Sequence, residues 1–181
     1  MLDLQNNKIA IFGIQGSGKT YLAKYLIRNF KTLVYEVNPD YRDTNAYVYQ
    51  GSKTLQDLNK FCENVKELAL KRKINAFLLD EADLFFRSNY DLQPNLNDLV
   101  INHRHYNLAL FFISRRPQDI PTKIVESCHY IIIFKLEGAN AINKFKEIDE
   151  RILPLLEKLQ YKDYRFIVKE IGKEPYICEK V

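Results

Sequence analysis

Eight residues near the start of the chain have the types and the spacing of a phosphate-binding loop. Residues 13–20 read Gly-Ile-Gln-Gly-Ser-Gly-Lys-Thr and match the pattern G-x-x-x-x-G-K-[ST] at every fixed position. Glycines let the backbone turn successive N–H groups inward, and the start of a helix adds partial positive charge there. We expect Lys19 to reach the β- and γ-phosphates of ATP and the Thr20 hydroxyl to hold Mg²⁺. The residues predicted to bind the nucleotide are Gly13, Gln15, Gly16, Ser17, Gly18, Lys19, Thr20 and Tyr21.

Two adjacent carboxylates follow a short apolar run further along the chain. Residues 76–79 read Ala-Phe-Leu-Leu, and Asp80 and Glu81 come directly after them. Ligands of parallel sheets bind beyond the carboxyl ends of the strands, where this pair would meet the phosphate-binding loop. We expect Asp80 to join the Mg²⁺ shell and Glu81 to orient and activate the attacking water. The alternative is that the pair caps a helix, and Asp83 is interpreted as a solvated or capping residue.

A hydroxyl ends a third apolar run. Residues 108–113 are all apolar, and Ser114 follows them. A strand here would lie between the strands of the phosphate-binding loop and of the acidic pair, so Ser114 could sense the γ-phosphate during catalysis. Plain turn chemistry also places hydroxyls at strand ends, and both readings stay open.

Alternating elements must position these side chains. Amphipathic patterns with a helical period alternate with short apolar runs, and the strands are apolar on both faces, which is typical of a mostly parallel sheet covered on both sides. Thr54 is the predicted N-cap of a long helix, with Asp57 as its capping-box partner. The sequence predicts an α/β fold of the three-layer P-loop (RecA-like) class, forming a single domain over residues 1–181 and ending in a small β-hairpin. Predicted strands cover 8–12, 32–37, 46–50, 76–79, 108–113, 130–136, 164–168 and 176–178; predicted helices cover 21–30, 54–69, 96–102 and part of 139–159.

Composition narrows the class of protein. The chain has 181 residues, 46% hydrophobic and 28% charged, which fits one globular domain and not a disordered chain. Its three cysteines are far apart and form no C-x-x-C pair, so we expect a reducing compartment and a cytoplasmic protein. The sequence lacks a run of about 18 apolar residues, so no transmembrane segment is predicted. A net charge of +4 permits a polyanionic partner.

The arginines before and after residues 108–113 carry a resemblance to a known family. Residues 102–107 read Asn-His-Arg-His-Tyr-Asn, and residues 114–117 read Ser-Arg-Arg-Pro. Over residues 8–136 this pattern resembles the FtsK–HerA superfamily of DNA-pumping ATPases. The resemblance implies that Arg104 is an arginine finger supplied to a neighbouring subunit. Arg87 is the other candidate because it also follows the acidic pair, and the alternative for either arginine is a solvated surface position or a salt bridge. Arg115 stands where the family commonly has glutamine, which leaves Ser114 as the polar sensor.

Within that superfamily, a chain without further domains resembles the genome-packaging ATPases of membrane-containing viruses. The resemblance implies a homo-oligomeric ring that moves double-stranded DNA into a capsid, bound without regard to sequence, with capsid or membrane-associated virion proteins as further partners and the host cytoplasm as its location. Basic groups that could contact DNA phosphates are Lys71-Arg72-Lys73, Arg115-Arg116 and Lys144-Phe145-Lys146, each of which is also consistent with an ordinary solvated surface.

Three other functions fit parts of the pattern. A HerA- or FtsK-like ATPase, or one similar to the zonula occludens toxin, would act in DNA transfer or phage assembly. A small-molecule kinase shares the phosphate-binding loop, although the adjacent Asp80 and Glu81 suit water activation better than transfer to a metabolite. A switch that binds ATP only to assemble would need no turnover.

Overall fold

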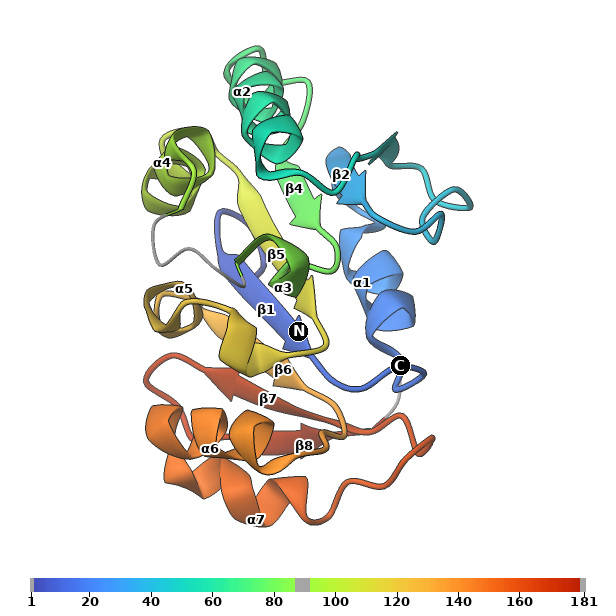
Figure 1. The fold of residues 1–181 in the computed structure, drawn as a ribbon, viewed down its shortest axis with the longest axis vertical. Coiled ribbons are helices and arrows are strands. Elements are labelled where there is room, and N and C mark those ends of the chain that lie inside the picture. The colour runs from blue at the N-terminus through green and yellow to red at the C-terminus, as the bar shows by residue number, and fades with distance from the viewer. Residues whose placement is uncertain (1, 87–91, 180–181) are drawn as a thin grey trace.

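The computed structural model describes residues 2–86 and 92–179, in which one eight-stranded sheet forms the centre of the fold (Figure 1). The strand order is β3-β2-β4-β5-β1-β6-β7-β8. The first six strands in this order pair in parallel, β7 pairs antiparallel with β6, and β8 pairs antiparallel with β7. This confirms the predicted mostly parallel sheet with a C-terminal hairpin. The strands are β1 Lys8–Phe12, β2 Thr32–Glu36, β3 Tyr47–Gln50, β4 Ala76–Leu79, β5 Ala109–Ser114, β6 Tyr130–Ile133, β7 Phe166–Glu170 and β8 Tyr176–Cys178.

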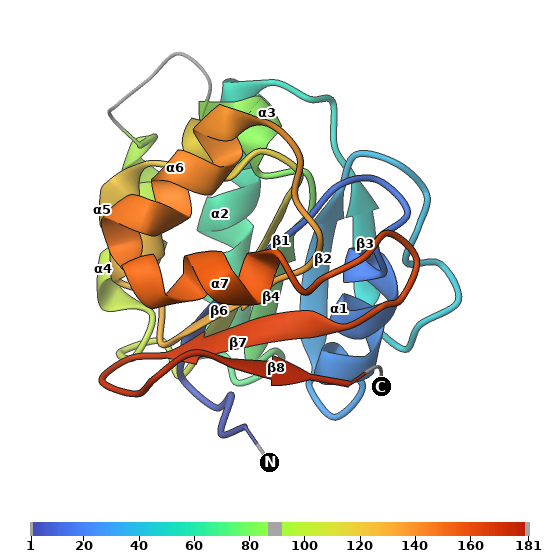
Figure 2. The same ribbon diagram turned by 90° about the horizontal axis from the view of Figure 1, so that it is seen from below.

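Alternating side chains of the strands fill two cores, one on each face of the sheet. In β1, Ala10 and Phe12 belong to one core and Ile9 and Ile11 to the other, and all four are buried. The strands are therefore apolar on both faces, as parallel strands covered on both sides must be. Both faces carry helices, as predicted: α2 to α7 lie over one face, and α1 lies over the other (Figure 2).

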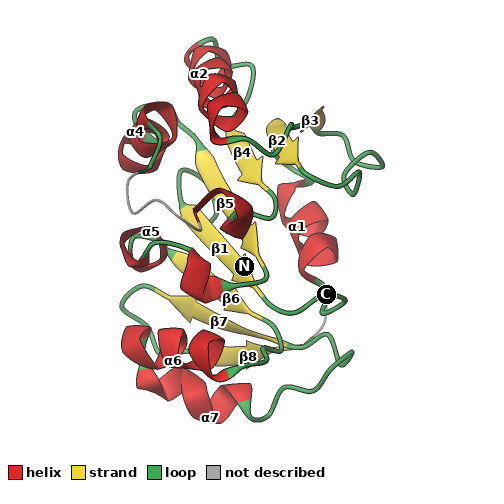
Figure 3. Cartoon of the chain, viewed as in Figure 1, coloured by secondary structure: helices red, strands yellow, loops and turns green. Residues whose placement is uncertain are grey.

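Figure 3 shows the helices in red, and α2 begins where the sequence supplies a capping residue. Thr54 caps α2, because its Oγ1 accepts a hydrogen bond from the Asp57 N–H at 3.2 Å. The predicted return bond from Asp57 is wrong, since that carboxylate instead accepts from the Ser52 N–H at 2.9 Å and from the Tyr35 hydroxyl at 2.7 Å. The helices are α1 Lys19–Ile27, α2 Leu55–Leu70, α3 Asp83–Phe86, α4 Pro94–Asn102, α5 Thr122–Glu126, α6 Ala139–Ile148 and α7 Leu153–Leu156, with 3-10 turns at Pro117–Asp119 and Glu150–Ile152.

The helical pattern after Gly138 is interrupted. α6 ends at Ile148, and Asp149 takes an extended backbone with φ −164°. The chain then makes a 3-10 turn, and Pro154 lies in the first turn of α7, where its missing N–H costs nothing. The break turns α7 back toward α6, so both pack on the same face of the sheet.

Candidate nucleotide-binding and catalytic site

The register of the sheet brings the predicted motifs to one edge. β5 lies between β1 and β4, with Phe12 paired to Ser114 and Leu79 paired to Phe112. The three strands run in the same direction, so the residues that follow β1 and β4 gather around Ser114 at the end of β5. The end of β4 is fixed on both sides: the Asp80 N–H donates to the Tyr35 carbonyl at 3.0 Å, and the Ala82 N–H donates to the Ile113 carbonyl at 2.8 Å.

The phosphate-binding loop connects β1 to α1 in a conformation that requires glycine. Gly18 precedes the helix with φ 106°, which an L side chain rarely adopts, and no side chain caps the helix there. The first N–H groups of α1 have no acceptor within the helix and point to the place where an anion would sit. Lys19 is buried, and its Nζ donates to the Ile14 carbonyl at 2.8 Å. Burial, together with the smaller effect of the Arg115 charge, lowers the pKa of Lys19 to about 8, against the opposing effect of the nearby carboxylates.

Asp80 and Thr20 fit a magnesium site. Asp80 is buried, and burial raises its pKa to about 7, with the nearby charges of Glu81 and Asp40 acting in the same direction. A desolvated carboxylate of this kind is stabilised by a bound cation. Both residues line one cleft, so the pair fits Mg²⁺ held jointly with phosphate oxygens. Among the described residues, there is no cluster of three or more His, Cys, Asp or Glu that would hold a metal by itself.

Glu81 is held by Arg115. Its backbone has φ 46°, in the left-handed region, so the chain turns sharply after β4. Glu81 Oε1 forms an ion pair with Arg115 Nη2, and the carboxylate is 15% exposed. The predicted base for water activation is thus paired with Arg115.

Ser114 has a buried partner that the sequence interpretation missed. Its Oγ donates to Asp83 Oδ1 at 3.0 Å, and the Arg115 N–H donates to the same oxygen at 3.3 Å. Asp83 is only 5% exposed, so its interpretation as a solvated residue is wrong. The short helix α3 turns Asp83 back under the end of β5, and its spacing of three from Asp80 was the only signal in the sequence.

A cleft of about 310 Å³ joins these groups. It is lined by Gln15, Gly16, Lys19, Thr20, Asp40, Asp80, Glu81, Ile113, Ser114 and Arg115. Of the residues predicted to bind the nucleotide, Gly13 and Ser17 are buried beneath the loop, and Tyr21 is exposed on α1.

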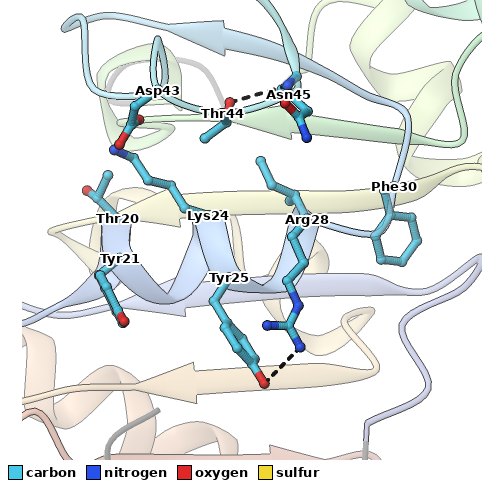
Figure 4. A pocket seen from close by; sticks show the side chains of 11 residues that line it. Thr20, Tyr21, Lys24, Tyr25, Arg28, Phe30, Asp43, Thr44 and Asn45 are labelled. Carbon is cyan, nitrogen blue, oxygen red and sulfur yellow. Dashed lines mark hydrogen bonds and ion pairs between the residues drawn. The ribbon is translucent and has the colours of Figure 1, made fainter.

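A larger hollow of about 570 Å³ lies on the other side of α1, between that helix and the loop before β3 (Figure 4). Its only carboxylate, Asp43, is paired with Lys24 at 2.6 Å, and the guanidinium of Arg28 lies 3.9 Å from the ring centre of Tyr25. The acidic pair and Ser114 do not line it. The acidic pair, Lys19 and Ser114 thus line the smaller cleft and not this hollow.

Arg104 lies at the opposite end of the strands, before the amino end of β5. It is exposed in the turn between α4 and β5, and its Nη2 donates to His129 Nε2 at 2.6 Å. The length of β5, roughly 17 Å at the usual rise per residue, separates it from Ser114. Arg104 therefore cannot act on the phosphate site of its own chain. Arg87, the other candidate finger, lies outside the described residues.

Within the described part of the chain, no helix is both long and apolar enough to cross a membrane. Among curated proteins, none matches this sequence.

The fold is similar to those of several solved structures. The genome packaging NTPase B204 from Sulfolobus turreted icosahedral virus 2, in complex with ATP-gammaS, has a TM-score of 0.81 at 17% identity, covering 97% of this chain and 98% of that one. EssC from Geobacillus thermodenitrificans gives 0.65 at 12% identity, covering 100% of this chain and 40% of that one. The N-terminal domain of zonular occludens toxin from Neisseria meningitidis gives 0.58 at 13% identity, covering 97% and 93%.

A family model gives a further result. The model of the ATPase family associated with various cellular activities (AAA) matches residues 9–136, which hold the phosphate-binding loop, the acidic pair and Ser114. This chain belongs to the AAA family of P-loop ATPases.

Proposed function

We propose that this ATPase is a motor that hydrolyses ATP to move double-stranded DNA, and that it packages a viral genome into a capsid. The observation that carries the proposal is the cleft, in which Lys19, Asp80, Glu81 and Arg115 surround one space. The similarity in fold to the genome packaging NTPase B204 over nearly the full length of both chains supports the packaging role. Membership in an ATPase family favours hydrolysis over the small-molecule kinase.

The residues of the cleft would share the work of hydrolysis. Loop N–H groups bind the phosphates, and Lys19 leaves the Ile14 carbonyl to neutralise the β- and γ-phosphates. Thr20 and Asp80 would hold Mg²⁺, which supplies charge neutralisation on the phosphate oxygens. Glu81, once released from Arg115, accepts the proton of the attacking water. Asp83 keeps Ser114 and the Arg115 backbone in place beside the γ-phosphate.

Arg104 would complete the site of a neighbouring subunit. An arginine finger acting between subunits makes hydrolysis depend on assembly, which suits a ring. Its exposure and its distance from its own phosphate site agree with this role.

Basic side chains at both ends of the parallel strands could contact the DNA backbone. Arg72 and Lys73 are exposed after α2, on the same edge as Arg104, and Arg116 is exposed near the cleft. Lys144 is buried and donates to the Thr122 hydroxyl, so its predicted phosphate contact is wrong. Contacts of this kind are made to phosphates and carry no sequence preference.

Turnover measured with and without long linear duplex DNA tests the motor. We expect DNA to stimulate ATP hydrolysis at low salt and the stimulation to fall steeply as salt rises. Glu81→Gln should lower kcat by about two to four orders of magnitude while retaining ATP binding, because it removes the proton acceptor alone. Lys19→Ala should weaken nucleotide binding itself.

Two results would argue against parts of the proposal. Turnover that ignores duplex DNA at every salt concentration would leave an ATPase that is not a DNA motor. Retained ATP binding without turnover in the wild type would favour an assembly switch. The fold similarity to zonular occludens toxin keeps DNA transfer or phage assembly as the second candidate, and packaging of DNA into isolated capsids would decide between them.

A further inference from the structure

Two tyrosines from the C-terminal part of the chain lie beside the phosphate-binding loop. Tyr161 and Tyr164 belong to residues 157–165, which connect α7 to β7. A Cβ built on Gly16 would lie 3.1 Å from the Tyr161 hydroxyl, and one built on Gly18 would lie 3.2 Å from Tyr164 Cδ1. A side chain at either glycine would press against one of these rings. We call Tyr161 and Tyr164 the tyrosine wall.

The tyrosine wall is held in a fixed turn. The Asp163 carboxylate accepts hydrogen bonds from the Gln160 N–H at 3.0 Å, the Arg165 N–H at 3.0 Å and Arg165 Nε at 2.9 Å. Arg165 Nη2 also donates to the Lys158 carbonyl at 2.8 Å. Tyr164 has φ 60°, a conformation that costs energy for a non-glycine residue and persists only where the surroundings enforce it. The turn thus positions the rings before any ligand binds.

Both tyrosine rings are partly exposed to solvent. Tyr161 is 52% exposed and Tyr164 is 46% exposed, although both approach the loop closely. The Lys162 ammonium lies 5.4 Å from the centre of the Tyr161 ring. Half-exposed aromatic faces beside a bound triphosphate are suited to stacking with a flat, electron-rich ring.

The orientation of the triphosphate follows from the sheet. The γ-phosphate must lie toward Asp80 and Glu81, which follow β4 on one side of the loop. β6 flanks β1 on the other side, and the Ile14 N–H donates to the Lys135 carbonyl just after β6. The α-phosphate and its nucleoside therefore leave the loop toward β6. The tyrosine wall lies on that side, because Phe134, which follows β6, contacts the same Gly18 position as Tyr164.

We propose that the tyrosine wall is the nucleobase subsite of this ATPase, where the base of ATP stacks on the ring of Tyr161 and is bounded by Tyr164. The inference rests on the proposed binding of ATP by the phosphate-binding loop. It separates two contributions to affinity: the loop and Lys19 bind the phosphates, and the tyrosine wall binds the base.

A comparison of two ligands tests the separation. The non-hydrolysable analogue AMPPCP has a base, and inorganic tripolyphosphate has none. Tyr161→Ala should weaken AMPPCP binding roughly fivefold, since stacking on an exposed ring lies at the low end of the measured range, and should leave tripolyphosphate binding unchanged. Tyr161→Phe should restore most of the AMPPCP affinity. Calorimetry with both ligands, with circular dichroism as the check on folding, gives the result.

Two control variants locate the base. Tyr47→Ala removes a ring that is 63% exposed on the edge strand β3, and we expect it to change neither affinity. Tyr25→Ala removes a ring from the hollow on the other side of α1. A loss of AMPPCP affinity in Tyr25→Ala with none in Tyr161→Ala would overturn the proposal, because the base would then lie in that hollow.

A fluorescent reporter gives a second readout. The chain has no tryptophan, so Tyr161→Trp introduces a single one. We expect AMPPCP to quench its emission and tripolyphosphate to leave it unchanged, and equal responses to the two ligands would contradict stacking. Failure of the proposed ATP binding by the loop looks different, since the wild type would then bind neither ligand and Lys19→Ala would change nothing.

Discussion

At the scale of single residues, the charged groups of the cleft are engaged with one another. Arg115 forms an ion pair with Glu81. Lys19 donates a hydrogen bond to the Ile14 carbonyl, and Ser114 donates one to Asp83. The first two contacts engage Glu81 and Lys19, which the proposed reaction needs for water and phosphate. The third contact fixes the position of Ser114. Nucleotide binding would exchange the first two contacts for contacts with phosphate.

Arg115 should distinguish ATP from ADP. Its guanidinium lines the cleft beside Glu81, on the side of the loop where the γ-phosphate is proposed to lie. Arg115→Ala should therefore reduce the ratio of ATP-analogue to ADP affinity by about tenfold, the value of one charge-assisted hydrogen bond. Calorimetric titrations with AMPPCP and ADP measure the ratio.

Arg116→Ala is the matched control for this prediction. The Arg116 side chain is 56% exposed and lies 3.9 Å from Asp119, outside the cleft lining. We expect it to leave the ratio unchanged. An equal loss of both affinities in Arg115→Ala would mean that the arginine only maintains the shape of the cleft.

At the scale of elements, two short segments position the side chains that surround the phosphate-binding loop and the end of β5. α3 has four residues, yet it returns Asp83 beneath the end of β5. The turn after α7 has no regular structure, yet its hydrogen bonds hold two aromatic rings against the phosphate-binding loop. The long helix α2 contributes its apolar stripe to the core and lies away from the cleft.

Asp163 should affect base binding through the turn that it holds. Asp163→Ala removes three hydrogen bonds, and we expect AMPPCP affinity to fall a few-fold with tripolyphosphate affinity unchanged, together with a loss of about 1–2 kcal/mol in the free energy of unfolding. Calorimetry and urea denaturation measure the two effects. Asp163→Asn, which keeps one acceptor oxygen, should lie between Asp163→Ala and the wild type.

Asp43→Ala serves as the control at a carboxylate of the other hollow. Its partner is Lys24, and the Asp43 side chain is 71% exposed, so the ion pair contributes little to stability.

A loss of tripolyphosphate affinity in Asp163→Ala would show that the turn supports the phosphate-binding loop as a whole and not the base alone.

At the scale of the whole molecule, the sheet separates two charged edges. The cleft lies at the carboxyl ends of the parallel strands, and Arg104 lies with His129 at their amino ends. A molecule with its phosphate site at one edge and an exposed arginine at the other is suited to head-to-tail contacts, which close into a ring when the rotation between subunits allows it.

Mixing two inactive variants tests the contact between subunits. Arg104→Ala removes the finger, and Lys19→Ala removes the phosphate contact. In mixed rings, about a quarter of the interfaces would join an intact Lys19 to an intact Arg104, so part of the ATPase activity should return. Activity at a series of mixing ratios, with mixed assembly verified by size and mass, measures it.

The control replaces the Arg104→Ala chain by the Arg104→Ala/Lys19→Ala double variant. Mixed with Lys19→Ala, it can form no intact site, and no activity should return. If the first mixture is equally inactive at every ratio, Arg104 does not act between subunits.

Local patterns were enough to predict the elements that carry the chemistry. The phosphate-binding loop and the order of apolar runs depend on neighbouring residues, and the structure confirms β1, β4 and β5 as parallel strands with β5 in the middle. The helix after Gly138 was harder to predict, because a single apolar stripe runs through a break at Asp149 that the sequence does not mark. The same limit applied to Asp57, whose partners lie on other elements.

The sequence by itself determined that the phosphate-binding loop lies at the end of the first strand and that a carboxylate pair meets it, because backbone conformation and parallel strand order follow from local residue types. Only the tertiary structure decided which side chains share the cleft. The pairing of Arg115 with Glu81, the burial of Asp83 and the approach of Tyr161 to Gly16 join residues 31 to 145 positions apart in the chain. Such contacts are set by packing across the sheet, which no local pattern records.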